Sequence, residues 1–131
     1  GYKFDRIKNN NSRLNYNIRI IVPEFTSICP VTSQPDFALF IIDYVPKSWL
    51  VESKSFKLFI HSFREHGIFH EDASLLIGQS LSKAIAPKWI RLVGYFAPRG
   101  GIPIDVYWQS GKCPDSVYVP KLNKYYDKLH I

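Results

Sequence analysis

Residues 37–45 read FALFIIDYV, an apolar run in which Asp43 is the one charged residue. A short run of this kind that ends at a proline predicts a buried β-strand. Before it, residues 16–22 are rich in β-branched side chains and predict a second strand, which we expect Pro23 to end. Residues 24–36 hold prolines among short polar side chains and predict an irregular loop between the two strands.

Two amphipathic helices are predicted after these strands. In residues 52–65, phenylalanine and isoleucine side chains recur at helical spacing and form one apolar face. We expect Ser53 or Ser55 to cap this helix and Gly67 to end it. A second helix is predicted over residues 71–84, with a proline shortly after it.

Two further strands are predicted over residues 89–96 and 104–109, with a proline and glycine turn between them. Strands on both sides of a helix pair indicate an α+β domain, with an antiparallel sheet that carries both helices on one face. We expect one domain over residues 1–131, with a loosely held polar arm at 1–13 and a docking tail at 111–131. The unpaired edges of such a sheet favour oligomerisation.

The composition limits the class of protein. The 131 residues suit one domain, and the net charge of +6 is spread along the chain, which fits a phosphate-bearing cofactor as well as RNA. Cys29 and Cys113 make no disulfide framework, and we expect Cys113 to be passive. No signal peptide or apolar run of membrane-spanning length is recognisable, so we expect a cytoplasmic protein with no membrane partner. The chain starts at Gly1 and contains no Met, from which we expect its native initiator end to be missing.

Three residues are candidates for chemistry. Cys29 lies in the predicted loop, where a thiolate could act as a nucleophile, although a lone cysteine is more often a small buried residue. Asp36, at the mouth of the apolar strand, is a candidate proton donor or a turn residue. Glu71 is a candidate acceptor for a ring N–H and an amine, or a first-turn acid that favours the helix dipole. Spacing does not decide among these alternatives.

Metal and nucleotide motifs are weak in this sequence. His66 and His70 are four residues apart, but Gly67 interrupts the helical spacing, and no His-Glu-x-x-His or Cys-x-x-Cys pattern occurs. We therefore expect no metal site. No glycine-rich phosphate loop is present, so the residues by themselves do not indicate a nicotinamide cofactor.

Four segments taken in order resemble the QueF family of nitrile reductases: EFTSICPVTSQPDFA at 24–38, ESKSFKLF at 52–59, SFREHGIFHE at 62–71 and PRGGIPID at 98–105. The resemblance implies the tunnelling fold (T-fold), in which a four-stranded antiparallel sheet carries two helices and subunits join edge to edge into rings. The chain is similar to the short, single-module branch, whose sites form between identical subunits.

The resemblance also implies a reaction. Cys29 would form a covalent thioimide with the nitrile of 7-cyano-7-deazaguanine, Asp36 would supply a proton, and NADPH would supply hydride. The product, 7-aminomethyl-7-deazaguanine, belongs to the synthesis of the tRNA base queuosine. No stable nucleic acid partner is implied.

Binding residues are implied by the same segments. Those for the substrate are Val51, Glu52, Ser53, His70 and Glu71. Those for NADPH are Ser53, Lys54, Arg99 and Gly100. One position departs from the family pattern, because Ser33 stands where the family usually has Gly, and a positive φ angle there would strain Ser.

Other functions remain open at this point. An amidine-forming transferase of the same fold would act on nitrile-bearing tRNA, but such proteins lack the ESKS-type segment that this chain has at residues 52–55. A tunnelling-fold hydrolase would need metal ligands. A basic RNA-binding module would rely on scattered cations and exposed aromatic rings, and its affinity would depend on salt.

Overall fold

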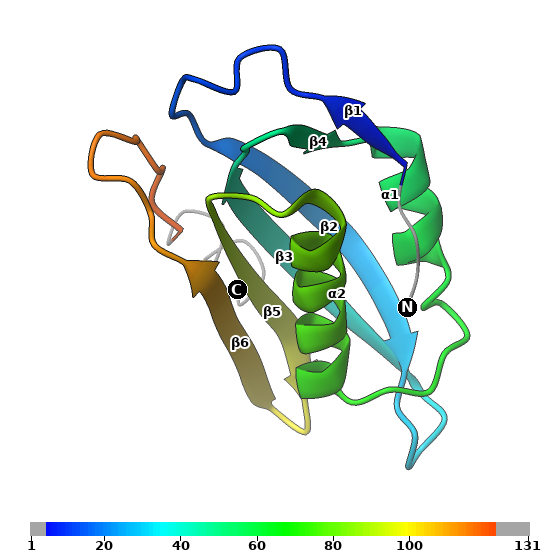
Figure 1. Ribbon diagram of the computed structural model, residues 1–131. Helices are drawn as coiled ribbons and strands as arrows, with labels where there is room; N and C mark the ends of the chain where they lie inside the picture. The colour runs from blue at the N-terminus through cyan, green and yellow to red at the C-terminus, as the bar shows by residue number, and fades with distance from the viewer. Residues whose placement is uncertain (1–4, 123–131) are drawn as a thin grey trace.

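The computed structural model describes residues 5–122. In chain order, its elements are β1 (Arg6–Lys8), β2 (Ile18–Ile28), β3 (Pro35–Val45), β4 (Trp49–Val51), α1 (Ser53–His61), α2 (His70–Ile85), β5 (Trp89–Arg99) and β6 (Ile102–Gly111). The four long strands form an antiparallel sheet in the order β2-β3-β5-β6. Both helices cover one face of this sheet (Figure 1), which confirms the predicted α+β fold class.

The central strand β3 is buried on both faces of the sheet. Ala38, Phe40, Ile42 and Tyr44 belong to the core under the helices, whereas Leu39 and Ile41 belong to a smaller cluster on the opposite face. Successive side chains of a strand point to opposite faces, so a strand covered on both sides needs apolar residues at nearly every position. This explains the continuous apolar run that predicted the strand.

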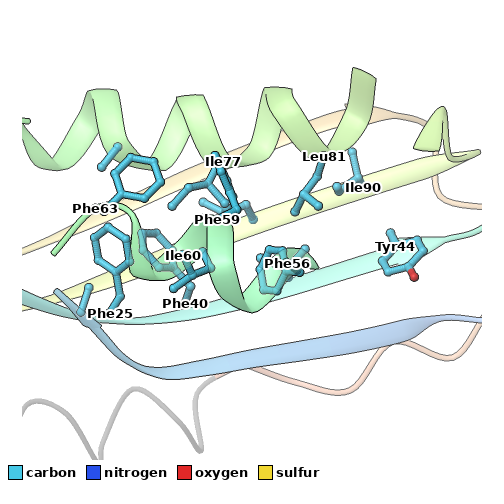
Figure 2. Packing of buried hydrophobic residues seen from close by; sticks show 14 of the residues in the cluster. Phe25, Phe40, Tyr44, Phe56, Phe59, Ile60, Phe63, Ile77, Leu81 and Ile90 are labelled. Atoms are coloured by element: carbon cyan, nitrogen blue, oxygen red, sulfur yellow. The ribbon is translucent and has the colours of Figure 1, made fainter. Parts of the chain in front are cut away.

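Phenylalanine rings fill the core between the sheet and α1 (Figure 2). The Phe25 and Phe40 rings meet edge to face with centroids 4.7 Å apart, and Phe25 also lies 5.5 Å from Phe63. Edge-to-face pairs contribute about 1 kcal/mol beyond the area that they bury. Because Phe25 comes from β2 and Phe63 follows α1, these contacts hold the α1–α2 connection against the sheet.

The strand β2 is longer than predicted, because it continues through Pro23 to Ile28. Its pairing with β3 shifts register between Val22 and Phe25, so Pro23 lies in a bulge on an edge strand. An edge strand has one side without ladder partners, and a proline without an N–H is tolerated there. The prediction that Pro23 ends the strand was therefore wrong, and the irregular loop shrinks to residues 29–34.

From Asp5 to Arg13 the amino-terminal arm is not loosely held, in contrast to the prediction, and residues 1–4 lie outside the described residues. Its strand β1 pairs with β4, and the Arg6 guanidinium lies 4.2 Å from the centre of the Trp49 ring. Asn9 is buried, its Nδ2 donates to the Lys47 carbonyl at 2.9 Å, and its Oδ1 accepts from the Tyr16 hydroxyl at 2.7 Å. Sequence reading missed β1 and β4 because each strand has three residues.

The cap of α1 also differs from the prediction. Glu52, rather than Ser53 or Ser55, is the capping residue, and its carboxylate accepts from the backbone N–H groups of Lys54 and Ser55. The Ser55 hydroxyl instead accepts from the Asp5 backbone N–H at 3.0 Å. A carboxylate at this position also favours the positive end of the helix dipole.

A charged cluster on the sheet face opposite the helices is bonded to the carboxy-terminal segment at Pro120. Asp43 is fully buried and accepts from Arg19 through two nitrogens at 2.8 and 3.0 Å, and from Arg91 at 2.9 Å. Arg19 also donates to the Pro120 carbonyl at 2.6 Å. Leu122 packs against the smaller apolar cluster that contains Leu39 and Ile41, and residues 123–131 of the predicted docking tail lie outside the described residues.

We predict that Asp43→Asn lowers the free energy of unfolding by about 3 kcal/mol, because the change leaves two arginines with one buried partner that has no charge. Urea denaturation followed by circular dichroism would measure the loss. Asp115→Asn is the matched control, since Asp115 is exposed on a turn and should have an effect of less than about 0.5 kcal/mol. Equal midpoints for the two variants would show that the Asp43 cluster does not stabilise the fold.

Candidate functional site

Cys29 is the first residue of the tight turn that joins β2 to β3. The Cys29 backbone N–H donates to the Gln34 carbonyl at 2.8 Å, and the Ser33 N–H donates to the Cys29 carbonyl at 2.9 Å. The preceding residue, Ile28, makes two backbone hydrogen bonds to the loop before α2. The Ile28 N–H donates to the His66 carbonyl, and the Ile28 carbonyl accepts from the Ile68 N–H, each at 3.0 Å. The thiol is thus presented on a braced hairpin and remains partly exposed.

Asp36 lies where β3, α2 and β5 meet. Its side chain is 4% exposed, its Oδ1 accepts from Arg99 Nη1 at 2.8 Å, and its Oδ2 lies 3.2 Å from His70 Nε2. The His70 ring stacks on Phe96 with centroids 4.0 Å apart, which sets the direction of its nitrogen atoms. A buried carboxylate with a guanidinium at one oxygen and an imidazole nitrogen at the other is an arrangement suited to proton transfer.

Arg99 connects the turns of the two hairpins. Besides its bond to Asp36, its Nη2 donates to Thr32 Oγ1 and to Gln34 Oε1, both at 2.9 Å. The hydrogen bond to Asp36 raises the pKa of Arg99 above its ordinary value, so the side chain is a permanent cation. A single guanidinium therefore organises the surroundings of both Cys29 and Asp36.

The Cys29 thiol is an acid of unusual strength. Its pKa is lowered from the ordinary 9.0 to about 7, first by a hydrogen bond from the Thr32 side chain and then by the backbone N–H groups of Thr32 and Val31. Arg99 makes a smaller contribution in the same direction. The lowered pKa increases the share of thiolate near neutral pH, and the thiolate is the nucleophilic form.

A pocket of about 400 Å³ opens between the two hairpin turns. Its walls are Gln34, Pro35, Asp36, Phe37, Ala97, Pro98, Arg99 and Gly100. Gly100 has a φ of 60° with open space around its α-carbon, and the cationic Arg99 lies beside it. A guanidinium next to unobstructed backbone suits a phosphate group, so these residues fit a phosphate-bearing cofactor.

The structure brings together part of the predicted site. The β2–β3 and β5–β6 turns lie at the same end of the sheet (Figure 1). At this end are Cys29, Asp36, His70, Arg99 and Gly100. Glu71 is exposed beside His70 in the first turn of α2.

The other predicted residues, Val51, Glu52, Ser53 and Lys54, lie at the opposite end of the sheet (Figure 1). The Val51 N–H donates to the hydroxyl of Tyr44, which pairs with Ile18 at the far end of β3. At roughly 3.3 Å per residue, the distance along β3 from Asp36 to Tyr44 is about 26 Å. One copy of the chain therefore does not unite the two groups.

Thr32 and Gln34 belong to the site, and sequence reading missed them. Both are polar residues of the segment that resembles the family's nucleophile loop, which is the one signal that pointed to them. Their importance depends on Arg99, which approaches from β5 and is more than sixty residues away in the chain. Spacing in the sequence carries no information on such a contact.

Within residues 5–122, no group of three His, Cys, Asp or Glu side chains is placed to hold a metal ion. Over the same range, no helix has the length and apolar character needed to cross a membrane.

Comparison with known proteins identifies the family of this chain. A family model described as "QueF-like protein" matches residues 35–115. The chain belongs to this family. A 7-cyano-7-deazaguanine reductase of Parvibaculum lavamentivorans, named as NADPH-dependent, is 60% identical over 88% of this chain and 75% of its own length. A protein of the same name from Bradyrhizobium diazoefficiens is 56% identical over 91% of this chain and 78% of its own.

A solved structure also shares the fold of this QueF-family chain. It is described as the archaeosine synthase QueF-Like in the apo form, and it aligns with a TM-score of 0.68 over 75% of this chain and 96% of that one. Only 21% of the aligned residues are identical, so this likeness concerns the fold alone.

Ser33, which departs from the family pattern, has a φ of 60°. A residue with a β-carbon is strained in this left-handed region. We predict that Ser33→Gly raises the free energy of unfolding by about 1 kcal/mol, as measured by urea denaturation. Ser116→Gly is the control, because Ser116 lies in an exposed turn with an ordinary φ and should gain nothing. Equal changes in the two variants would mean that no strain is stored at Ser33.

Proposed function

We propose that this chain is an NADPH-dependent reductase that converts the nitrile of 7-cyano-7-deazaguanine to an aminomethyl group, in the synthesis of queuosine. The observation that carries the proposal is the pairing of a thiol of lowered pKa, Cys29, with a buried acid, Asp36, in one hydrogen-bonded cluster. Relatives at 56% and 60% identity that are named for this reaction support it. The cytoplasmic location expected from the sequence is part of the same proposal.

In this proposal Cys29 is the nucleophile. Its thiolate adds to the nitrile carbon, a new carbon–sulfur bond forms, and the nitrogen takes up a proton to give a thioimide. After hydride reaches this carbon, the carbon–sulfur bond breaks. The Cys29 thiolate departs, and an imine remains. Because the pKa of Cys29 is about 7, the same sulfur is both an adequate nucleophile and an adequate leaving group near neutral pH.

Asp36 is the group that delivers the proton to nitrogen. Its two oxygens face different partners, with Arg99 at Oδ1 and His70 at Oδ2. The short distance to His70 Nε2 supports a route by which the ring replaces the proton that Asp36 gives up. His70 is thereby a positioning and relay residue in the proposal.

Recognition of the deazaguanine is assigned to the first turn of α2. Glu71 is exposed beside His70, so its carboxylate is free to accept from a ring N–H and an exocyclic amine. Two parallel hydrogen bonds to one carboxylate discriminate strongly against a base that lacks either donor.

Arg99 and Gly100 are the residues assigned to the cofactor on this side of the sheet, because they fit a phosphate. NADPH supplies the hydrides for the two reductive steps when it is bound. The protein contributes the cation that orients the phosphate, and a closed surface over the pocket would keep water from the imine.

The proposal includes a site shared by two copies of the chain. Val51, Glu52, Ser53 and Lys54 of one copy would complete the site that contains Cys29 and Asp36 of another, because they lie at the far end of their own sheet. The edge strands β2 and β6 leave backbone groups for such pairing between copies. An edge-to-edge ring satisfies both conditions.

We predict that the protein oxidises two equivalents of NADPH for each 7-cyano-7-deazaguanine, measured by the loss of absorbance at the NADPH band. Cys29→Ala should abolish the activity because no thioimide can form, and Asp36→Asn should lower kcat by about 100-fold or more. Glu71→Ala should act mainly on KM, since Glu71 is assigned to binding. Turnover by Cys29→Ala near that of the unaltered protein would refute covalent catalysis. Adduct formation on Cys29 without NADPH oxidation would favour the amidine-forming transferase.

The shared site gives a second prediction. The Cys29→Ala and Lys54→Ala chains should each be inactive or weak alone. When they are unfolded and refolded together, we expect about a quarter of the normal activity, because random pairing unites the two intact halves at that fraction of sites. Cys29→Ala mixed with Asp36→Asn is the control, since both changes affect the same end of the sheet and no pairing repairs them. Activity that never exceeds the sum of the separate variants would place the whole site in one chain.

A further inference from the structure

The pairing of β2 with β3 continues in one register as far as the cysteine turn. Ser27 lies opposite Asp36, and the Cys29 backbone N–H donates to the Gln34 carbonyl at 2.8 Å, so the ladder reaches one residue beyond β2. Opposite residues share a face of the sheet, and so do alternate residues of one strand. Ser27, Cys29 and Asp36 therefore point to the same face. This is the face that α2 covers, as the contact of Asp36 with His70 shows.

Ser27 is buried and has no partner for its hydroxyl. The side chain is 0% exposed, and its Oγ makes no hydrogen bond to any of the described residues 5–122. Three other buried side-chain atoms are in the same state, on Asn17, Arg91 and Asp105. Asn17 and Arg91 each bond Asp43 through another of their atoms, and Asp105 is likewise not free. Serine has one polar side-chain atom, so the whole side chain of Ser27 goes without a bond.

A buried hydroxyl without a partner destabilises a fold, because it gives up its bonds to water and gains none in return. Ser74 shows the usual state of a serine at 0% exposure, since its hydroxyl donates to the His70 carbonyl at 2.8 Å. Native proteins depart from such local rules mainly at functional sites. The place of Ser27, opposite the buried acid Asp36, is such a site.

Ser27 lies within reach of a group bound between Cys29 and Asp36. The β-carbons of directly opposite residues are about 5 Å apart, which sets the separation of Ser27 from Asp36. Alternate residues of a strand are about 7 Å apart, which sets its separation from Cys29. In a thioimide the two covalent bonds from sulfur through carbon to nitrogen span about 3 Å. A nitrogen held in this way, and directed toward Asp36, is therefore at hydrogen-bonding distance from Ser27.

Exposure decreases from the nucleophile inward. Cys29 is partly exposed, Asp36 is 4% exposed and Ser27 is closed from solvent. A nitrile is a linear group of two atoms, so its nitrogen is the part of the substrate that extends beyond the sulfur into the site. Ser27 thus faces the nitrogen and no wider part of the substrate. Exclusion of water at this depth also protects an imine from hydrolysis.

We propose that Ser27 is a further catalytic residue, whose hydroxyl donates a hydrogen bond to the nitrile nitrogen as negative charge develops there. When the Cys29 thiolate adds to the carbon, a carbon–sulfur bond forms and one electron pair of the triple bond moves to nitrogen. The nitrogen then takes the proton of Asp36, and Ser27 keeps its own. A fixed donor at the point where charge develops stabilises the transition state more than the ground state. This inference rests on the proposed function.

The test is the rate at which Cys29 forms a covalent adduct with 7-cyano-7-deazaguanine in the absence of NADPH, followed by mass spectrometry of the Cys29 peptide. Ser27→Ala removes the hydroxyl and should slow this step by about 100-fold, the usual effect of losing a donor to a developing charge. Ser27→Cys has a similar volume and a weaker donor, so its rate should lie between the two. Thr26→Val is the control, because Thr26 points to the opposite face of the same strand and should leave the rate unchanged.

Stability distinguishes a catalytic hydroxyl from a structural one. Ser27 has no bond to lose, so Ser27→Ala should keep or raise the midpoint of urea denaturation. Ser74→Ala is the matched comparison and should lower the midpoint, because its hydroxyl bonds the His70 carbonyl. A lower midpoint in Ser27→Ala, together with slow adduct formation, would make the hydroxyl a structural group and overturn the inference.

Alkylation of Cys29 by iodoacetamide, which contains no nitrile, checks where Ser27 acts. The rate should be the same in Ser27→Ala and in the unaltered protein, because the hydroxyl acts on nitrogen and not on sulfur. Slower alkylation in the variant would assign the hydroxyl to the thiol and contradict the inference.

Failure of this inference differs from failure of the proposed function. Equal rates of adduct formation in Ser27→Ala and in the unaltered protein would refute the role of Ser27 alone. An unaltered protein that forms no adduct and oxidises no NADPH would refute the proposed function, and the inference with it.

Discussion

The burial of β3 on both faces is the constraint on which the rest of the structure depends. Helices cover one face of this strand, and the segment up to Leu122 packs on the other, so its side chains have no solvent-exposed direction except at the ends. Asp36 stands at one such end, buried yet next to the turn that carries Cys29. The central strand thus brings a carboxylate to the boundary between core and solvent, where its partners come from other elements.

A strand that is buried on both faces has no solvent to stabilise a charge, and β3 contains one charged residue in its middle. Asp43 is fully buried and is tolerated because Arg19 and Arg91 neutralise it from the neighbouring strands. Arg19 then uses the same nitrogen to hold the Pro120 carbonyl. An ionic group in the sheet therefore ties a distant segment to the face opposite the helices.

At the site, Arg99 has the equivalent role. It neutralises Asp36, bonds two residues of the cysteine turn and lines the pocket assigned to the cofactor. Its three acceptors, Asp36, Thr32 and Gln34, connect the acid to the turn that carries the nucleophile. A ligand that competes for this guanidinium would therefore change the surroundings of both Cys29 and Asp36.

The local patterns of the sequence determined much of this. The apolar run at 37–45 predicted β3, helical spacing predicted α1 and α2, and ordered segments resembling the QueF family indicated Cys29 and Asp36 as partners. The strand and helix predictions were confirmed because each depends on residues close together in the chain. The catalytic roles of Cys29 and Asp36 stay predictions. Pro23 misled the reading because its tolerance depends on β2 being an edge strand, which is a property of the sheet.

Tertiary structure decided what depends on contact between distant residues. The positive φ of Ser33 makes the departure from the family pattern a strained position, and a one-letter sequence contains no backbone angle. The approach of Arg99 to Thr32 and Gln34, and the separation of Lys54 from Cys29 along the sheet, follow from how β5 and α1 pack. The sequence by itself determined which chemical groups are available, and the fold decided which of them meet, because hydrogen bonds act over a few ångströms in space and not along the chain.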